Sequence, residues 1–244
     1  MDTRNKKLYL GIDIGGWKIR GVLWDGRRAA AAYEVPTPRT KAAFVRTLRR
    51  LVGRLSLRAN GRIRGIGIGA AGVIEKTRVR YSPNIPYLRH FDFRTLFPSV
   101  PLRVDNDARA FVRAEWMRGA GKGAKRILGF TIGTGIGRAY GRQGRIVVLK
   151  KFEHPEKSEH SYNRIRDGGN SRVLVKFLGD IIAAISKRYN ADLLLFGGGV
   201  LGRPGFLRQL TRELVSRGID QPIRRARLGR NAGAIGAAML FGQE

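Results

Sequence analysis

Three glycine turns each follow a stretch with the residue alternation of a β-strand. They are Asp13-Ile14-Gly15-Gly16, Gly133 to Gly137 (GTGIG) and Gly197-Gly198-Gly199. Glycine lets the backbone approach a phosphate group closely and point its N–H groups at the phosphate oxygens. One such turn is common for steric reasons alone, but three in one chain favour phosphate binding. The P-loop and dinucleotide fingerprints do not fit, because GTGIG precedes a further strand and not a helix.

A second constellation is Asp105-Asn106-Asp107, at a predicted strand end just before the helix that carries Phe111 and Trp116. Asp107 then lies in the first turn of that helix. In a phosphoryl-transfer enzyme a carboxylate placed here accepts the proton of an attacking hydroxyl group. The alternative is that Asp105 or Asn106 only caps the helix, which is a common arrangement.

The patterns of apolar residues predict two similar α/β halves, each with a strand hairpin, a third strand, a helix and a further strand. We expect the closing helices of the chain after the second half. A cleft between two such lobes is the natural ligand site. The predicted strands are 8–14, 19–25, 29–35, 63–70, 126–131, a hairpin strand after 136, 145–150 and 192–196, and the predicted helices are 40–55, 173–185, 206–215 and 231–241.

Composition excludes several classes of protein. The chain has 244 residues, 43% of them apolar, and no cysteine, so disulfides, thiolate metal sites and a cysteine nucleophile are excluded. No apolar run approaches the roughly 20 residues that span a bilayer, and the start MDTRNKK lacks the apolar core of a signal peptide. We expect a cytoplasmic protein without membrane contact.

The net charge of +30, from 48 Lys and Arg against 18 Asp and Glu, would attract nucleic acid or other polyanions. The basic residues are spread from Arg4 to Arg230 and are not interleaved with aromatic residues as on a base-stacking surface. Compositional bias is therefore favoured over a nucleic-acid site. Non-specific binding of RNA or DNA stays as the alternative from another class.

In several segments the chain resembles the ROK family of sugar kinases, within the actin/hexokinase/Hsp70 ATPase superfamily. The most specific segment is 104–137, which joins Asn106-Asp107-Ala108 to the GTGIG turn in the family's order. The other similar segments are LYLGIDIGGWKIRGVLWD (8–25), IGIGAAGVIE (66–75), YSPNIPYLRHFDF (81–93), LLLFGGGVL (193–201) and RLGRNAGAIGAAML (227–240).

The resemblance implies a two-lobed actin-like ATPase (ribonuclease H-like) fold with a cleft between lobes. One lobe would comprise residues 1–104 and 230–244, and the other residues 105–229. The implied activity is ATP-dependent, Mg²⁺-assisted phosphorylation of a hexose or N-acetylhexosamine, glucokinase-like. A small sugar is the implied partner, and a homodimer is left open.

The resemblance also implies a role for each matching residue. Asp107 would be the general base on the sugar hydroxyl, Asn106 would bond a neighbouring hydroxyl, and Asp13 would orient Mg²⁺ through water. Gly72 and Asn84 would contact the sugar, and Gly198 and Gly199 would lie against the adenosine. The implied phosphate contacts are Gly15, Gly16, Lys18, Gly133, Thr134 and Gly135.

Two departures from the family pattern stand out. Trp17 replaces a threonine of the first phosphate turn. After Gly144 the chain lacks the family's Glu-x-Gly-His sugar clamp and its cysteine-rich zinc segment, so we expect no zinc. We interpret residues 151–163 as a hydrophilic loop in which Glu153 and His154 are the candidate substitutes, and Asp167-Gly168-Gly169-Asn170 as a turn and helix cap. A catalytically inactive nucleotide- or sugar-binding protein is therefore the alternative within the family. Because the first strand begins near Leu8, we expect no helix-turn-helix of the kind the family's repressors carry.

Overall fold

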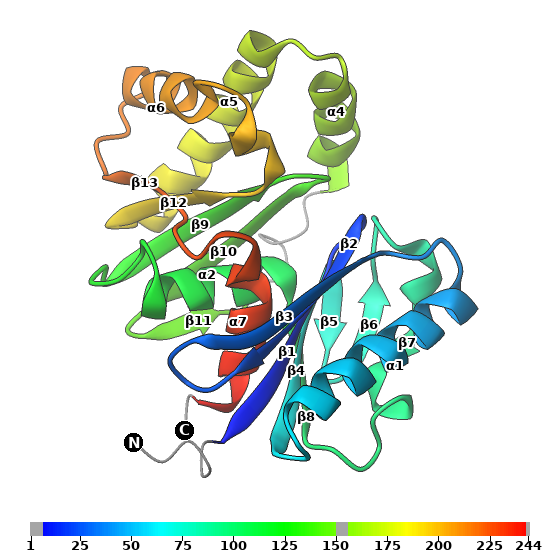
Figure 1. Ribbon diagram of the computed structural model, residues 1–244. Coiled ribbons are helices and arrows are strands. Elements are labelled where there is room, and N and C mark those ends of the chain that lie inside the picture. Colours follow the sequence, from blue (N-terminus) through cyan, green and yellow to red (C-terminus); the bar gives the residue numbers. More distant parts are fainter. Residues whose placement is uncertain (1–6, 150–155, 243–244) are drawn as a thin grey trace. The chain divides into compact units, whose positions relative to one another are not determined.

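The computed structural model describes residues 7–149 and 156–242 (Figure 1). The chain divides into two compact units: unit 1 is Met1–Ala114 with Gly229–Glu244, and unit 2 is Glu115–Leu228. The first division lies inside helix α2 (Asp107–Arg118), whereas the sequence placed the boundary at residue 104, in the strand before it.

Unit 1 contains a five-stranded sheet in the order β3-β2-β1-β4-β8. Strands β1, β2 and β3 are antiparallel neighbours, and β4 and β8 run parallel to β1. The strands are β1 (Leu8–Ile14), β2 (Lys18–Trp24), β3 (Ala29–Pro36), β4 (Ile63–Ala70) and β8 (Leu102–Asn106), and the helices are α1 (Lys41–Arg58), the start of α2 and α7 (Ala232–Ala238).

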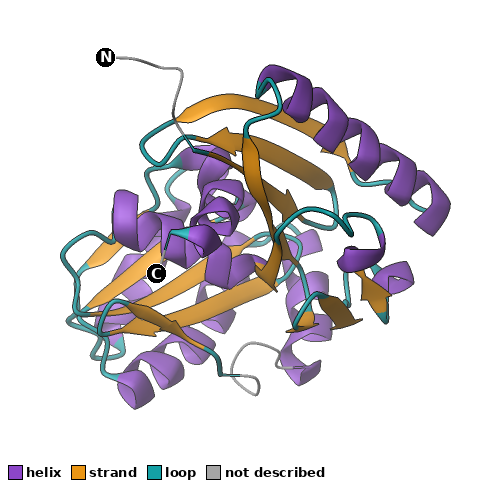
Figure 2. Ribbon diagram, turned by 90° about the horizontal axis from the view of Figure 1, so that it is seen from below, coloured by secondary structure: helices purple, strands orange, loops and turns teal. Residues whose placement is uncertain are grey.

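Unit 2 repeats this topology with a sheet in the order β11-β10-β9-β12-β13. Helices α5 and α6 pack against one face of the sheet and against each other, since their apolar residues share one cluster with Phe130 and Phe196 (Figure 2). The repeated topology confirms the two similar halves. The strands are β9 (Arg126–Ile132), β10 (Ile136–Arg142), β11 (Arg145–Val147), β12 (Leu193–Gly197) and β13 (Ile223–Arg225), and the helices are α4 (Glu156–Asp167), α5 (Ser171–Tyr189) and α6 (Phe206–Ser216).

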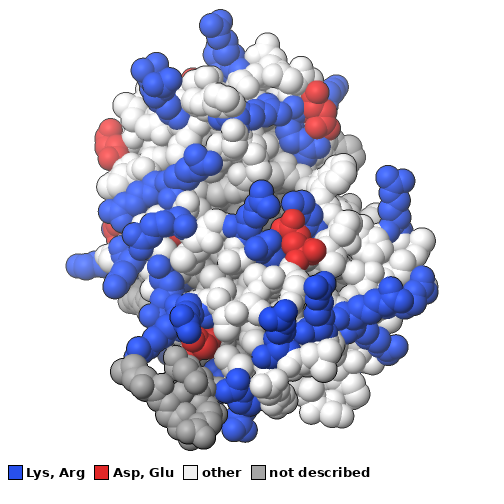
Figure 3. Space-filling model, in the orientation of Figure 1, with Lys and Arg blue, Asp and Glu red and all other residues white. Residues whose placement is uncertain are grey.

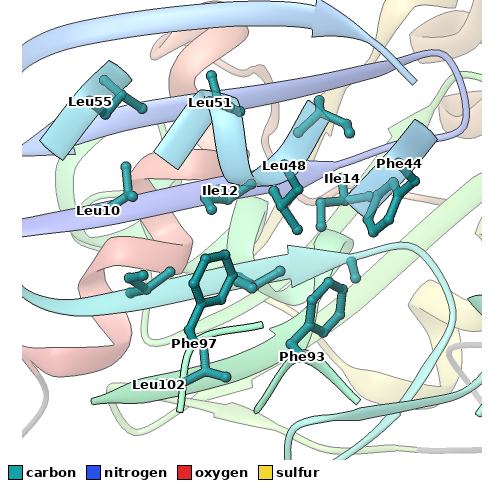
Figure 4. Close-up of a cluster of buried hydrophobic side chains, with 14 of the residues drawn as sticks. Leu10, Ile12, Ile14, Phe44, Leu48, Leu51, Leu55, Phe93, Phe97 and Leu102 are labelled. Carbon is teal, nitrogen blue, oxygen red and sulfur yellow. The ribbon is translucent and has the colours of Figure 1, made fainter. Parts of the chain in front are cut away.

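The two faces of the unit 1 sheet differ because side chains alternate along each strand. Leu10, Ile12 and Ile14 of β1 are fully buried and face Phe44, Leu48, Leu51 and Leu55 of α1 (Figure 4). The residues that alternate with them, Tyr9, Gly11 and Asp13, therefore face the other side of the sheet. Burial of the apolar row fixes the register of β1, because a slip by one residue would exchange the two faces.

Helix α7 approaches that second face so closely that only glycine fits at the contacts. A Cβ at Gly11 would lie 1.8 Å from the Ala234 carbonyl oxygen, and one at Gly67 would lie 1.9 Å from that of Ala237. On the helix side, a Cβ at Gly236 would lie 1.7 Å from the Ala110 oxygen of α2. These contacts set the positions of α7, β1, β4 and α2 relative to one another.

Two parts of the chain differ from the sequence-based expectation. Residues 73–92 form a small sheet, β5 (Val73–Glu75), β6 (Arg78–Tyr81) and β7 (Phe91–Asp92), which no pattern predicted. The expected loop 151–163 is wrong from residue 156 onward, where α4 begins. The predicted cap is confirmed, since Asn170 Oδ1 accepts from the Arg172 and Val173 N–H groups at the start of α5. Among the described residues, no helix has both the length and the apolar composition needed to cross a lipid bilayer.

Candidate functional site

In unit 1, Asp13 and Asp105 lie at equivalent heights on the sheet, on the face that carries α7. Asp13 pairs in register with Gly69 of β4, and Gly69 with Asp105 of β8. The residue after Asn106 begins α2, and a Cβ at Gly69 would lie 3.5 Å from the Asp107 Cα. The carboxyl ends of three neighbouring strands thus bring Asp13, Asp105 and Asp107 to one edge.

The three polar residues before α2 divide their tasks. Asp105 is buried and pairs with the buried guanidinium groups of Arg109 and Arg113, so it fixes α2 against the sheet. Asn106 caps the helix, because its Oδ1 accepts from the Ala108 and Arg109 N–H groups at 3.0 and 3.2 Å. The capping alternative therefore holds for Asn106, whereas Asp107 has a different environment.

Asp107 is the first residue of α2 and is half-buried. Its Oδ1 accepts from the Ala108 N–H at 2.9 Å. Burial raises the pKa of Asp107 to about 6, against the lowering effect of that backbone bond and of Arg109. A carboxyl group with a pKa near neutral is suited to take up a proton during a reaction.

Asp13 has an even more perturbed carboxyl group. Burial, and then the nearby charge of Asp107, raise the pKa of Asp13 to about 7, although Arg20 opposes the shift. The carboxylate occupies space left by a glycine of α7, since a Cβ at Gly233 would lie 2.3 Å from Asp13 Oδ2. Arg20 itself is held by Glu34 and Asn231.

The donor set around Asp13 and Asp107 fits a magnesium ion. Mg²⁺ prefers carboxylate oxygens and is commonly held by one or two of them together with water and substrate phosphates. Two carboxyl groups whose charges repel each other favour a bound proton or a cation between them. Within the described ranges, no three His, Cys, Asp or Glu side chains gather to hold a metal ion by themselves.

The sugar-side candidates lie beside Asn106. Its Nδ2 donates to the Gly72 carbonyl at 3.1 Å, so these two residues are in contact. Gly72 has a φ of +124°, and a Cβ there would lie 2.1 Å from the Tyr81 carbonyl oxygen. Asn84 follows in the same segment and is half-buried. Contact of these groups with a sugar stays a prediction.

The first glycine turn connects β1 to β2. Gly15 N–H donates to the Lys18 carbonyl at 3.0 Å, and Thr37 Oγ1 donates to the Gly15 carbonyl at 2.7 Å. Lys18 Nζ lies 2.6 Å from Glu34 Oε1, so its charge is paired on the surface. The Trp17 side chain, which replaces the family's threonine, is 75% exposed. Gly16 remains a half-buried part of the turn.

In unit 2 the second glycine turn connects β9 to β10 and is held from α4. Tyr162 Oη donates to the Gly133 carbonyl at 2.8 Å, and Arg166 donates to the Gly133 and Thr134 carbonyls. Because C=O and N–H point in opposite directions across a trans peptide, the Thr134 and Gly135 N–H groups are turned away from α4. A Cβ at Gly133 would meet no atom within 4 Å, so this turn is open to approach.

The third turn lies beside the second. Gly198 has a φ of +100°, and a Cβ there would lie 2.4 Å from the Ile132 carbonyl oxygen at the end of β9. Gly199 is exposed, with open space where a Cβ would stand. Neighbouring parallel strands bring their carboxyl ends together, which is where ligands bind in open α/β sheets.

Sequence reasoning missed the residues that hold these turns, Thr37, Tyr162 and Arg166. Tyr162 and Arg166 are four residues apart in a strongly polar stretch, a helical spacing that was hidden by the low apolar content of α4. The clamp substitutes Glu153 and His154 lie outside the described residues.

The known proteins that are similar to this chain point to the same family. The chain matches the ROK family over residues 9–148. It is 34% identical to a glucokinase of Streptomyces coelicolor over 160 residues, 60% of this chain and 49% of the relative. It is 28% identical to a polyphosphate glucokinase of Mycobacterium leprae over 256 residues, 97% of this chain and 75% of the relative.

Among solved structures, an inorganic polyphosphate/ATP-glucomannokinase from Arthrobacter sp. strain KM is 29% identical, with a TM-score of 0.81 over 96% of this chain and 98% of that one. The chain spans about half the length of most curated relatives it matches. The fold is therefore the two-lobed actin-like ATPase fold of the ROK sugar kinases, and the chain belongs to the ROK family.

Proposed function

We propose that the protein transfers a phosphoryl group to a sugar hydroxyl, with Asp107 as general base. The observation that carries the proposal is the half-buried Asp107 carboxyl at the start of α2, with its pKa raised to about 6 beside Asp13. Oδ1 is bonded by the Ala108 N–H, which orients the carboxyl group. In the reaction Asp107 accepts the hydroxyl proton, the sugar oxygen bonds to the terminal phosphorus, and the bond from that phosphorus to the leaving phosphate breaks.

The donor phosphates bind at the glycine turns. The Thr134 and Gly135 N–H groups supply hydrogen bonds, and Arg166, whose charge is paired with Asp167, holds the turn from behind. Gly15 and Gly16 serve as the second phosphate segment, and Gly198 and Gly199 lie against the nucleoside of ATP. Lys18 contacts the phosphates only when its ion pair with Glu34 is broken.

Asp13, with Asp107 beside it, would hold Mg²⁺, as the family resemblance implies. When bound, the ion neutralises charge on the donor phosphates. The Asp13 carboxylate has a fixed place at the acidic edge of the site, because it lies between α7 and Arg20.

The acceptor is a hexose or an N-acetylhexosamine, as in glucokinases and N-acetylglucosamine kinases similar to this chain. Asn106, Gly72 and Asn84 form its side of the site, and Glu153 and His154 are further candidates. The cytoplasm remains our prediction for where the protein works.

ATP is the first candidate donor, and inorganic polyphosphate is the second. Two similar proteins suggest the second donor: a polyphosphate glucokinase and an inorganic polyphosphate/ATP-glucomannokinase match 97% and 96% of the chain, although a glucokinase solved with glucose and AMPPNP also covers 96% of it. The net charge of +30 also suits a polyanionic donor.

The test is phosphorylation of a panel of hexoses and N-acetylhexosamines with Mg-ATP or polyphosphate, followed by sugar-phosphate formation. Asp107→Asn is expected to lower kcat by about 10²–10⁴-fold. In the wild type, kcat/KM should fall tenfold per pH unit below about pH 6, the pKa of Asp107. The matched control is Asp220→Asn, an exposed carboxylate in unit 2.

Equal rates for wild type and Asp107→Asn would remove Asp107 from the mechanism. Binding of ATP without turnover of any sugar would favour the inactive binding protein that Trp17 and the missing clamp suggest. A thermal-shift screen with each donor and sugar reports binding independently of turnover.

A further inference from the structure

A groove with a cationic lining runs along the β13 edge of unit 2. It consists of two adjoining cavities of about 610 and 430 Å³ that share Lys122 and Arg224. We call it the basic groove, and its cationic residues are Lys122, Lys125, Arg224, Arg225 and Arg227. Figure 3 shows Lys and Arg side chains gathered on the side of the molecule where Figure 1 draws β13.

The walls of the basic groove are held by Glu115, which is fully buried. Its Oε1 accepts from the Arg227 and Leu228 N–H groups at 2.8 and 2.6 Å, and its Oε2 accepts from the Ala120 N–H at 2.8 Å. Arg224 Nη1 closes the span from the other side by donating to the Ala120 carbonyl at 3.0 Å. The loop 119–124 and the segment 224–228 are therefore fixed together before any ligand arrives.

The positive charge of the basic groove is largely uncompensated. In the part of the chain that the structure describes, its one acidic lining residue is Asp192, which is bonded by Arg126; this bond lowers the pKa of Asp192 and offsets its charge. Lys122, Lys125, Arg225 and Arg227 are exposed, and within the described residues none of these four side chains has an ion-pair partner. A site with these charges selects an anion.

The cations follow a line and do not surround a point. Lys125 precedes β9, Arg224 lies on β13, and Arg227 lies past its end, whereas Arg225, the next residue of β13, carries its side chain on the opposite face of the sheet. Arg225 pairs in register with Phe196, the residue before the Gly197–Gly199 turn. The groove therefore runs from the beginning of the parallel strands toward the edge that carries the glycine turns, which suits an extended ligand.

The lining offers nothing for nucleobases. Among the described residues, no aromatic side chain lines the two cavities, and stacking on aromatic rings is the usual contact of single-stranded nucleic acid. A third cavity of about 950 Å³ adjoins at Lys125 and includes Trp116 and Tyr140, but both are only 8% exposed. The basic groove can therefore recognise its ligand only through the repeated negative charges of that ligand.

We infer that the basic groove binds a linear chain of inorganic phosphate and anchors long polyphosphate beside the donor site. The inference rests on the proposed function in one respect: the anchored chain would be the phosphoryl donor.

The test compares Lys122→Gln/Arg227→Gln with the control Lys187→Gln/Arg208→Gln, which removes the same charge from exposed positions on α5 and α6 of unit 2. Binding of long-chain polyphosphate and of tripolyphosphate is measured by titration calorimetry at several salt concentrations. The groove variant should bind the long chain about tenfold more weakly, which is the product of two exposed ion pairs worth about threefold each. The slope of log Kd against log[salt] should fall by about two, one per cation removed, as for phosphate contacts to DNA.

The control should match the wild type in long-chain binding, and ATP-dependent kinetics should be unchanged in both variants. Equal weakening in the two variants would overturn the inference, because net charge alone would then explain binding. Tighter binding of an RNA or DNA oligonucleotide than of polyphosphate, lost in the groove variant only, would overturn it in favour of nucleic acid. If no sugar is phosphorylated but the groove variant alone loses polyphosphate, the proposed function fails and the groove stands. If polyphosphate supports turnover but the wild type, the groove variant and the control all bind the long chain equally, the proposed function stands and the inference about the groove fails.

Discussion

Replacement of three helical glycines by alanine tests how the Asp13 carboxylate is held. In an open position, Gly→Ala in a helix stabilises a protein by up to about 1 kcal/mol. Gly53 of α1 is such a position, since its Cβ would meet no atom within 4 Å. At Gly233 the Cβ would lie 2.3 Å from Asp13 Oδ2 and 2.5 Å from Cγ, and at Gly236 it would lie 1.7 Å from the Ala110 backbone oxygen.

The expected order follows from what each Cβ meets. Gly53→Ala stabilises by about 0.5–1 kcal/mol. Gly233→Ala destabilises by about 1–3 kcal/mol, as overpacking does, and lowers activity because Asp13 must move. In an Asp13→Ala background the obstructing atoms are gone, so Gly233→Ala becomes neutral or stabilising by up to about 1 kcal/mol. Gly236→Ala meets backbone, so Asp13→Ala does not relieve it.

The assay is urea unfolding of the three single variants, of Asp13→Ala and of its two double variants, followed by circular dichroism. The coupling free energy between residues 13 and 233 should reach about 1–3 kcal/mol, and that between 13 and 236 should stay within about 0.5 kcal/mol. Additive effects at 13 and 233 would refute the claim that this glycine makes the space for the carboxylate.

Three further outcomes are expected. The pKa of Asp13 is about 7 in the folded protein against an ordinary 3.8, so the folded state binds more protons between these values and stability falls as the pH rises through that window. Without divalent cations, Asp13→Asn should thus raise the unfolding free energy by on the order of 2–4 kcal/mol at pH 8 and by little below pH 4, and an equal gain at both pH values would contradict this. Tyr162→Phe, which loses one hydrogen bond to the turn, should raise KM for the donor about fivefold and leave KM for the sugar unchanged; a parallel rise in both would argue against a role at the phosphates. Trp17, 75% exposed, should account for most acrylamide quenching of tryptophan fluorescence, since the other two tryptophans are buried, and Trp17→Phe should abolish it.

The sequence predicted those elements whose residues alternate or recur at helical spacing. The first strand is one example: its apolar residues recur at every second position, and the same alternation places Asp13 on the opposite face. The Asn170 cap was equally readable, because it precedes a long apolar stripe. Local pattern and tertiary packing agree at these positions, so the pattern was sufficient.

Helix α4 and the small sheet lack such patterns. Among the described side chains of α4, only Tyr162 is fully buried, so no apolar stripe distinguishes it from a solvated loop. Strands β5, β6 and β7 have three, four and two residues, too few for alternation to show. Lys76, in the turn between β5 and β6, has a positive φ of 54°, a conformation that lysine rarely adopts.

Glu115 was invisible for another reason. In the sequence it is one of several charged residues of α2, and its helical position does not distinguish it. Only the fold shows that its carboxylate accepts hydrogen bonds from the N–H groups of Arg227 and Leu228, which follow it by 112 and 113 positions in the chain. A buried carboxylate requires hydrogen-bond donors such as these backbone N–H groups, and no local pattern encodes a partner that distant.

The glycines show how function and packing become separable only in three dimensions. In the sequence, Gly133 and Gly233 look alike, since each stands in a glycine-rich stretch. In the structure, a Cβ at Gly133 would enter open space, whereas one at Gly233 would collide with Asp13. Open glycines leave room for a ligand to reach the main chain, and closed glycines bring two parts of the protein together. The phosphate-binding hypothesis therefore rests on Gly133 and Gly199, which are open, and the position of the acidic edge rests on Gly233 and Gly236, which are closed.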